Sequence, residues 1–530
     1  MIFFINAAMQ PQKSGIEHAE LKRFELFNNH EVMSQFVIRD WDPKLHSHAA
    51  LAGIDDRHLI GMFDYFQQAL AVESTPMTAA DLDLGVLNTH LEEDEANHRS
   101  LVYDADNKLV ARVNYFNETT TVRSVELFDS YLNLYRVDNY DERGFVSLSQ
   151  HYTPDNNIGT ETWYTPNGDP VLETFNRDNM AKNFGKTGWF LRDWHGQDFV
   201  FDSIEELTKH FFDDLNEDNW SEAHPNVFIL DRSHLGDWGL TDLKLPAYTV
   251  MHLHNSHTGD AQDPETATLN NHYEYAINAI DDYDAVVSAT QRQTDDVRRR
   301  FAPRAELFTI PVGVVPDAVL NEPRVPVAER QFGKVVAFAR IAWEKRLEDL
   351  VKAVGIARQT VPELTLDLYG YADSSDNYKA RRAVEDAIQA YGLEDVVQLK
   401  GYTTDVAKIE REAMVFGLTS RMEGFNLAIL EGISHGLIGL TYDVNYGPNE
   451  IVQDGHNGRV VPFGDNEALA HALVTIMQSR QLAQEYSTGA YDSAERYSEA
   501  NVWAAWQSLL DDADKRWPVK LAAARLTTTR

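Results

Sequence analysis

The sequence contains no cysteine among its 530 residues. This absence excludes disulfides, thiolate nucleophiles and zinc sites built on thiolates. The chain also lacks an apolar run of about 18 residues, the length that a membrane-spanning helix needs, so no integral membrane segment is expected. Residues 1–15 begin with apolar residues but have no basic region and no long apolar core. They read as a first core strand rather than a signal peptide, and we expect a cytoplasmic protein.

Positive charge is scarce as well. Lysine and arginine total 47 against 83 aspartates and glutamates, which gives a formal net charge of -36. A chain this acidic repels phosphate polymers unless its basic residues gather locally. We therefore expect no nucleic-acid binding and no docking on an anionic membrane.

The apolar pattern changes along the chain. Near both ends, short apolar runs alternate with helical segments, which indicates parallel sheets with right-handed crossovers. Between roughly 100 and 205, runs rich in Tyr, Phe, Thr and Val alternate with period two, and residues 166–169 (Pro-Asn-Gly-Asp) predict a hairpin. A helix is expected near 268–281. Strands of the two parallel sheets are expected at 2–8, 37–39, 226–231, 248–254 and 284–290, and then at 334–340, 364–370, 396–401, 413–420, 437–443 and 458–463.

The predicted fold class is α/β, with two Rossmann-like domains facing a cleft and an antiparallel β-rich insertion in the first domain. A ligand in such a fold lies at the carboxyl ends of the strands, where loops and helix N-termini converge. The expected parts are a first Rossmann-like domain (1–95 and 206–315), the β insertion (96–205), a linker (316–331), a second Rossmann-like domain (332–500) and a C-terminal helical segment that packs back on the first domain (501–530).

The strongest local signal is the stretch from Glu423 to Glu431, which follows an apolar strand and opens a helix. Gly424 and Asn426 suit a turn that exposes backbone N–H groups at the start of this helix. Such groups bind the oxygens of a polar or anionic ligand. On spacing alone, an ordinary capped helix with a solvated glutamate explains the stretch equally well.

Two cations precede this stretch. Arg340 ends the strand predicted at 334–340, and Lys345 follows five residues later, so both would project from one strand-to-helix loop. Two fixed cations in a cleft can neutralise a diphosphate. Taken alone, the pair is better explained as ordinary surface charge.

Three histidines, His252, His254 and His257, follow one another at a predicted strand end. Three histidines can bind zinc, but no motif such as HExxH completes a metalloenzyme site. One histidine acting as a hydrogen-bonding group or base, or a purely structural histidine, fits the pattern better than a metal. Gly15 lies between the first strand and the first helix, without the GxGxxG pattern of a dinucleotide site.

Together these residues resemble a known family. Arg340 with Lys345, and Glu423 with Glu431 after a strand, are similar to the donor site of the family-4 retaining glycosyltransferases of GT-B fold. The resemblance covers essentially the whole chain. The segments at 14–27, 253–257, 338–351, 420–436 and 442–452 resemble a bacterial subgroup that glycosylates serine-rich or Ser-Asp-repeat adhesins, or poly(glycerol-phosphate) and poly(ribitol-phosphate) wall teichoic acids.

The resemblance implies a role for each residue. Arg340 and Lys345 would bind the diphosphate and stabilise the leaving UDP, and Glu423 would contact the donor sugar. His254 would lie near the donor sugar and the acceptor. The remaining implied donor contacts are the backbone at Gly424, Phe425 and Asn426 for the sugar hydroxyls, Glu431 for the ribose, Gly401 and Tyr402 for the uracil, and Gly15 for the diphosphate. Related enzymes often have a glycine pair in the first loop, where this chain has Ser14-Gly15.

The implied activity is the transfer of glucose or N-acetylglucosamine from a UDP-sugar, with no metal and no cofactor. The leading hypothesis is transfer to Ser/Thr hydroxyls of a bacterial adhesin, and the alternative is a teichoic acid acceptor. An inactive partner subunit is a third hypothesis, disfavoured because Arg340, Lys345, Glu423 and Glu431 are all present. The net charge leans slightly against a polyphosphate acceptor. The family also implies a homo-oligomer formed through the β insertion.

Overall fold

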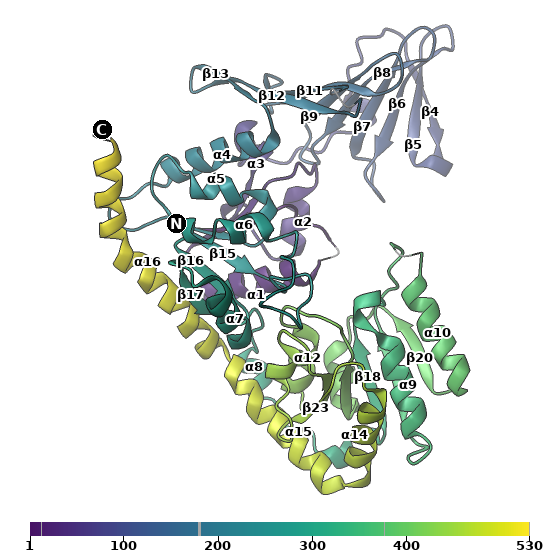
Figure 1. Cartoon of the computed structure of the whole chain (residues 1–530). Coiled ribbons are helices and arrows are strands. Elements are labelled where there is room, and N and C mark those ends of the chain that lie inside the picture. Colours follow the sequence, from purple (N-terminus) through teal and green to yellow (C-terminus); the bar gives the residue numbers. More distant parts are fainter. Residues whose placement is uncertain (12, 179–181, 376, 529–530) are drawn as a thin grey trace. The chain divides into compact units, whose positions relative to one another are not determined.

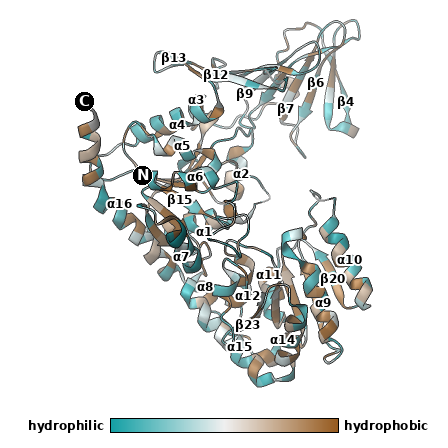
Figure 2. Ribbon diagram, in the orientation of Figure 1, coloured by the Kyte–Doolittle hydropathy of each residue, from teal (hydrophilic) through white to brown (hydrophobic). Residues whose placement is uncertain are grey.

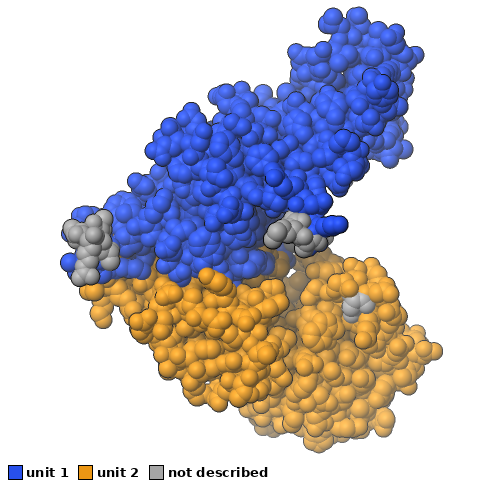
Figure 3. All heavy atoms as spheres, turned by 45° about the horizontal axis from the view of Figure 1, so that its top comes forward, with its two compact units in different colours: residues 1–13, 33–247, 520–530 blue, residues 14–32, 248–519 orange. Residues whose placement is uncertain are grey.

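The computed structural model describes residues 1–11, 13–178, 182–375 and 377–528. The chain divides into two compact units, coloured blue and orange in Figure 3. Unit 1 comprises residues 1–13, 33–247 and 520–530, and unit 2 comprises residues 14–32 and 248–519. Among the described residues, no helix combines the length and the apolar character that crossing a membrane requires.

Unit 1 begins with a set of parallel strands in the order β14-β1-β2-β3. All five residues of β1 are buried, as expected for a strand covered on both faces. The strands are β1 (Ile2–Asn6), β2 (Ser34–Ile38), β3 (Leu59–Gly61) and β14 (Val227–Leu230), and the helices of this unit are α2 (Leu45–Leu51), α3 (Met62–Phe66), α4 (Ile204–Asp218) and α5 (Asp237–Thr241).

The β insertion is a ten-stranded antiparallel sheet in which strands β4 to β13 follow one another in sequence order (Figure 1). The predicted hairpin at 166–169 is confirmed, since it joins β10 to β11 with Gly168 at φ +90°. The core on one side contains Trp163 stacked on Trp189, with ring centroids 5.5 Å apart. The strands are β4 (His90–Asp94), β5 (Arg99–Tyr103), β6 (Leu109–Tyr115), β7 (Val122–Phe128), β8 (Leu134–Tyr140), β9 (Val146–Tyr152), β10 (Ile158–Tyr164), β11 (Pro170–Asp178), β12 (Phe184–Trp194) and β13 (Gln197–Phe201).

Unit 2 contains three parallel strands in the order β17-β16-β15 and a separate six-stranded parallel sheet in the order β20-β19-β18-β21-β22-β23. All six strands predicted for the later sheet are confirmed. The strands are β15 (Tyr248–Leu253), β16 (Ala285–Ser288), β17 (Glu306–Thr309), β18 (Lys334–Phe338), β19 (Thr365–Tyr369), β20 (Val397–Gly401), β21 (Val415–Leu418), β22 (Ile438–Tyr442) and β23 (Gly458–Val461).

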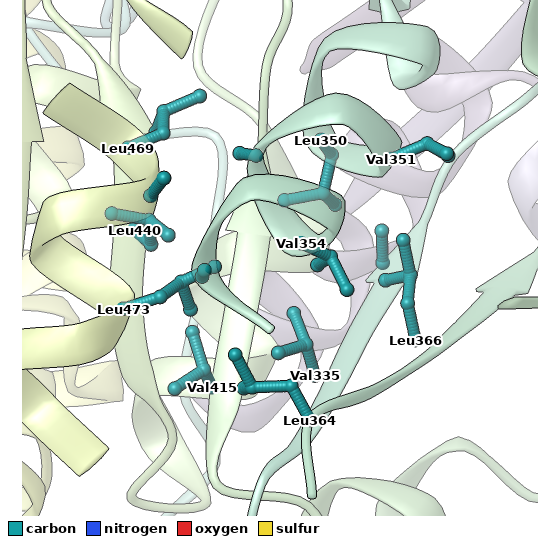
Figure 4. Packing of buried hydrophobic residues seen from close by; sticks show 14 of the residues in the cluster. Val335, Leu350, Val351, Val354, Leu364, Leu366, Val415, Leu440, Leu469 and Leu473 are labelled. Carbon is teal, nitrogen blue, oxygen red and sulfur yellow. The ribbon is translucent and has the colours of Figure 1, made fainter. Parts of the chain in front are cut away.

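Helices complete the layers of unit 2. Leu350 and Val354 of α9 are fully buried against Val335 and Val415 of the six-stranded sheet (Figure 4). The helices are α1 (Gly15–Asn29), α6 (Glu274–Asn278), α7 (Gln291–Phe301), α8 (Asp317–Leu320), α9 (Leu347–Ala357), α10 (Lys379–Tyr391), α11 (Val406–Glu412), α12 (Leu427–Ser434), α13 (Pro448–Ile451), α14 (Asn466–Gln478) and α15 (Arg480–Ala494).

The final helix, α16 (Glu499–Thr528), carries hydrophobic and hydrophilic residues along its whole length (Figure 2). Trp503 and Trp506 pack edge-on against Phe27 of α1, with ring centroids 5.5 and 5.6 Å away. Farther along, Asp512 accepts a hydrogen bond from the Tyr248 hydroxyl at 2.6 Å. Within unit 2, this helix therefore fixes both α1 and β15.

The predicted helix at 268–281 is wrong for most of its length. Only α6 is α-helical there, because Asn270 uses its side chain in backbone contacts that compete with a helix. Its Nδ2 donates to the Ser256 carbonyl at 3.0 Å, and its Oδ1 accepts from the His272 N–H at 3.1 Å.

The segment predicted as a linker is firmly packed within unit 2. Arg330 is buried and donates hydrogen bonds to the carbonyl groups of Glu410, Ala413 and His435. The compact units are divided in another way, since unit 2 includes residues 14–32 and 248–315. The boundaries of the two Rossmann-like domains stay a prediction.

Candidate active site

The centre of the candidate site is an ion pair between Lys345 and Glu423. Lys345 Nζ lies 2.7 Å from Glu423 Oε1, and the two side chains are only 19% and 10% exposed. Lys345 ends the short 3-10 helix η7 (Trp343–Lys345) after β18, and Glu423 follows β21. Because β18 and β21 are neighbouring parallel strands, the loops at their carboxyl ends meet at one edge of the sheet.

These two loops are tied together by further contacts. Thr419 Oγ1 lies 3.2 and 2.9 Å from the carbonyl oxygens of Lys345 and Arg346. The Arg421 N–H donates to the Glu344 carbonyl at 2.7 Å. An ammonium has three N–H donors, so Lys345 can bind Glu423 and still donate to an anionic ligand.

Arg340 lies in the same loop as Lys345 and is held by two carboxylates. One Nη donates to Asp373 and the other to Glu344, each at 2.7 Å, and the Arg340 side chain is 42% exposed. Asp373 follows β19, the strand on the other side of β18. Two of the five N–H donors of the guanidinium are used in this way, which orients the group and leaves donors for phosphate oxygens.

The backbone at Gly424 lies too close to its neighbours for any larger residue. A Cβ atom at Gly424 would fall 1.9 Å from the His254 carbonyl oxygen, and one at Gly447 would fall 2.1 Å from the Phe425 carbonyl oxygen. The loop that contains Glu423 is thus held between two other backbone segments. Phe425 is buried, and its ring packs edge-on against Tyr497 with centroids 5.6 Å apart.

Asn426 begins helix α12 in a left-handed conformation, with φ +77°. Its side chain caps the helix by accepting a hydrogen bond from the Ile429 N–H at 2.9 Å. Glu431, one turn into the helix, has a side chain that is 45% exposed and lies 3.7 Å from Lys22 Nζ of α1. The structure therefore separates the two glutamates, with Glu423 nearly buried and Glu431 at the surface.

The histidines have different surroundings. His254 directly follows β15, its N–H donates to the Tyr273 hydroxyl at 3.1 Å, and its ring lies 4.1 Å from that of His252. His257 is fully buried, and its Nε2 is 3.2 Å from the Pro264 carbonyl. Burial lowers the pKa of His257. These contacts fit the structural alternative for His257, while His254 lies next to the loop of Glu423 through its carbonyl.

Gly15 is the first residue of α1. Ser14 caps this helix, and a Cβ atom at Gly15 would meet no described atom within 4 Å. Packing within the described chain therefore does not require glycine at this position, which leaves room beside the loop.

Gly401 ends β20 with φ +70°, and its carbonyl accepts from the Gly370 N–H at 2.9 Å. The Tyr402 side chain that follows is 76% exposed. Both residues lie at the carboxyl edge of the sheet that also carries Arg340, Lys345 and Glu423.

A buried carboxylate behind α12 was not foreseen from the sequence. Glu410 is fully buried, and its Oε2 accepts from His435 Nδ1 at 2.8 Å. Burial raises the pKa of Glu410 to about 7, against the opposing effect of His435. His435 directly follows α12, so this pair supports the helix that carries Glu431 from its other end. No spacing in the sequence signals the pair.

The comparison with known proteins agrees with this geometry. Residues 322–493 match the family model described as Glycosyl transferases group 1. This range contains Arg340, Lys345, Glu423 and Glu431. Residues 322–493 are thus similar to the group 1 glycosyltransferases, and the chain has the GT-B fold. The predicted family, the α/β fold class and the assignment as a sugar-transferring enzyme are confirmed.

Individual relatives match most of the chain or nearly all of it. It is 24% identical to the UDP-N-acetylglucosamine--peptide N-acetylglucosaminyltransferase GtfA subunit of Streptococcus pneumoniae, over 96% of this chain and 99% of that protein. It is 26% identical to the poly(glycerol-phosphate) alpha-glucosyltransferase of Bacillus subtilis, over 78% of this chain and 58% of that protein. The crystal structure of the pneumococcal O-GlcNAc transferase GtfA with UDP and GlcNAc is similar with a TM-score of 0.76 at 23% identity, covering 97% of this chain and 98% of that one.

Proposed function

We propose that the protein is a retaining glycosyltransferase that moves glucose or N-acetylglucosamine from a UDP-sugar to Ser/Thr hydroxyls of a bacterial cell-surface adhesin. The observation that carries this proposal is the contact between Lys345 and Glu423 at the carboxyl edge of the sheet. It brings a cation and a carboxylate together in one nearly buried place, inside the segment that matches the glycosyltransferase family. In the proposal the cation binds phosphate and the carboxylate binds the sugar.

In the proposed reaction, Arg340 and Lys345 bind the diphosphate and stabilise the charge that develops on the leaving UDP. Glu423 and the backbone from Gly424 to Asn426 hold the donor sugar. The acceptor hydroxyl attacks from the side of the departing phosphate, which takes its proton, so the anomeric configuration is retained. The two cations supply the charge that a divalent ion provides elsewhere, so the proposed reaction uses no metal.

The other donor contacts follow the same scheme. Glu431 binds the ribose, Gly401 and Tyr402 bind the uracil through backbone atoms, and Gly15 lets the first loop approach the diphosphate. His254 lies near the sugar and the acceptor. The exposed position of the Glu431 side chain supports its role, because a ligand can reach the carboxylate.

The acceptor has a second candidate. The similarity to the poly(glycerol-phosphate) alpha-glucosyltransferase of Bacillus subtilis favours a wall teichoic acid, reached by the same mechanism. The peptide acceptor stays the first candidate because the relative named for a peptide acceptor is 24% identical over 99% of its length. The poly(glycerol-phosphate) enzyme is matched over 58% of its length, and the poly(ribitol-phosphate) alpha-N-acetylglucosaminyltransferase of Staphylococcus aureus, matched over 99%, is 20% identical. The net charge of -36 also disfavours a polyphosphate chain.

The proposal extends to the parts of the chain. Residues 1–95 and 206–315 form the acceptor domain, residues 332–500 form the donor domain, and the β insertion joins copies of the chain into a homo-oligomer. The reaction takes place in the cytoplasm, where nucleotide sugars are made, before the acceptor is exported.

The test is UDP release by the purified protein with a panel of UDP-sugars, crossed with a Ser-rich peptide and a poly(glycerol-phosphate) chain. We expect release with UDP-glucose or UDP-N-acetylglucosamine, stimulated by the peptide. Stimulation by the polymer alone would replace the first acceptor with the second. No release from any UDP-sugar, with either acceptor, would refute the enzyme and favour an inactive partner subunit.

A further inference from the structure

The backbone of Glu423 is bonded to residues 445 and 446, which follow β22. The Glu423 N–H donates to the Asn445 carbonyl at 3.3 Å, and the Tyr446 N–H donates back to the Glu423 carbonyl at 2.9 Å. This pair of backbone bonds fixes the main chain of Glu423, and therefore the direction from which its carboxylate meets Lys345. Whatever holds residues 445 and 446 also holds the ion pair.

Helix α7 forms hydrogen bonds with this segment at several points. Tyr446 is fully buried, and its hydroxyl donates to Asp296 Oδ2 at 2.8 Å. Arg292 donates to the Asn445 side chain at 2.9 Å. Farther along, the N–H groups of Gln291 and Arg292 donate to the Glu450 carboxylate at 3.1 and 2.9 Å.

The contact between Tyr446 and Asp296 is the most deeply buried of these. Asp296 is 2% exposed, and its other carboxylate oxygen accepts from Arg299. Burial, reinforced by the bond to Asp296, raises the pKa of the Tyr446 hydroxyl far above its usual range. The hydroxyl therefore stays protonated at every ordinary pH and donates a hydrogen bond to Asp296.

We propose that Tyr446 and Asp296 are positioning residues of the glycosyl transfer: through the backbone of residues 445 and 446 they hold Glu423 against Lys345. Neither residue touches the reacting atoms in this scheme. The inference rests on the proposed function, because it assigns the ion pair to the donor site.

The consequence is a defect in the chemical step rather than in donor binding. When Tyr446 loses its bond to Asp296, the loop of Glu423 gains freedom and the reacting geometry is less often correct. Misplacement of about 1 Å can reduce turnover about 100-fold, even when it originates outside the reacting centre. A loss confined to kcat marks an interaction needed in the transition state.

The test compares four variants by UDP release. Tyr446→Phe removes only the hydroxyl, and Asp296→Leu removes its acceptor. Asp296→Asn keeps one oxygen that can accept from Tyr446 and is expected to lose less turnover than Asp296→Leu. Asp295→Leu is the matched control, since Asp295 neighbours Asp296 on α7 but bonds at the surface to Gln291 and Arg298.

We expect Tyr446→Phe and Asp296→Leu to lower kcat about 10- to 100-fold, with the KM for the UDP-sugar nearly unchanged. The control should behave like the parent protein. An unchanged kcat in Tyr446→Phe, or an equal loss in Asp295→Leu, would overturn the inference. Because Tyr446→Phe keeps the buried ring, it serves as the deciding variant if Asp296→Leu does not fold.

A second measurement does not depend on enzyme activity. The rate at which an amine-acylating reagent labels Lys345, followed by mass spectrometry, reports how tightly Glu423 holds the ammonium. We expect faster labelling in Tyr446→Phe and no change in Asp295→Leu. If the parent protein releases no UDP, the proposed function fails, and this labelling still decides whether Tyr446 positions the pair. Equal labelling in all variants would refute the positioning role.

Discussion

Two lysine–glutamate pairs of almost equal length lie in different regions of the molecule. In the β insertion, Lys186 Nζ is 2.8 Å from Glu161 Oε2, and in the six-stranded region Lys345 Nζ is 2.7 Å from Glu423 Oε1. The first pair joins β12 to β10 across the face of a sheet, and Lys186 also lies over the rings of Trp163 and Trp189. The second joins two loops beyond the ends of parallel strands. The position relative to the strand ends, rather than the pair itself, marks the candidate site.

The glycines of the two regions differ in how closely other backbone atoms approach them. In the insertion, Gly168 occupies a hairpin turn where an added Cβ atom would meet nothing within 4 Å of the described chain. In the six-stranded region, added Cβ atoms at Gly424 and Gly447 would collide with carbonyl oxygens at 1.9 and 2.1 Å. Gly168 serves the local geometry of a turn. Gly424 and Gly447 allow two other backbone segments to pack against the loop that contains Glu423.

The largest difference between the two pairs is expected when Lys345 and Lys186 are each replaced by alanine. Lys345→Ala should reduce UDP release ~100–1,000-fold, the usual cost of losing one preorganised group that stabilises developing charge. Lys186→Ala should leave donor hydrolysis nearly unchanged, because its ammonium lies on a sheet face of the insertion. Near-normal turnover of Lys345→Ala would remove Lys345 from the mechanism.

Gly424→Ala tests the close packing around Glu423. The new methyl group must displace the His254 carbonyl or its own loop, so we expect a folded protein whose UDP release is about 10- to 100-fold slower. Gly259→Ala is a suitable control within unit 2, since an added Cβ atom there would make only an ordinary contact, 3.5 Å from Thr268 Oγ1. Equal activity of the two variants would contradict the importance of this packing.

The pH dependence of the free energy of unfolding tests the buried pair of Glu410 and His435 at the end of α12. The pKa of Glu410 is raised from 4.5 to about 7, so between these values the folded protein holds a proton that the unfolded chain releases. The contribution of Glu410 to the stability of the fold is therefore greatest below pH 4.5 and falls as the pH rises to about 7. Urea midpoints at pH 5 and pH 8 should differ less for Glu410→Gln than for the parent protein. An identical pH dependence would show that Glu410 does not titrate in this range.

The smallest effect is expected in the insertion. Gly168→Ala places a methyl group at φ +90°, which costs about 1–2 kcal/mol of local stability because L-residues disfavour this region. UDP release without an acceptor should stay unchanged, because the hairpin carries none of the residues that bind the donor in the proposed scheme. A change in that rate comparable to Gly424→Ala would link the insertion to the donor site.

Most of the regular structure could be predicted from the sequence. The six strands from 334 to 463 are short apolar runs between helical segments, and their burial in a parallel sheet follows from that pattern. The helix expected at 268–281 was wrong because the side chain of Asn270 bonds to Ser256, a contact that periodicity does not reveal.

The candidate site was only partly predictable. The sequence placed Arg340 and Lys345 on one loop and Glu423 on another, but the direct contact between Lys345 and Glu423 depends on β18 lying beside β21. Two strands, β19 and β20, come between them in the chain. The partners Asp373 of Arg340 and Lys22 of Glu431 come from other elements and carry no local signal.

The packing of α16 on α1 also affects when the molecule can become complete during synthesis. Domains generally fold as they emerge from the ribosome, N-terminal parts first. Here α1, which carries Gly15 and Lys22 near the start of the chain, places Phe27 against Trp503 and Trp506 near its end. A nascent chain can therefore assemble the sheets early, but it cannot finish the surroundings of α1 until those tryptophans have been translated.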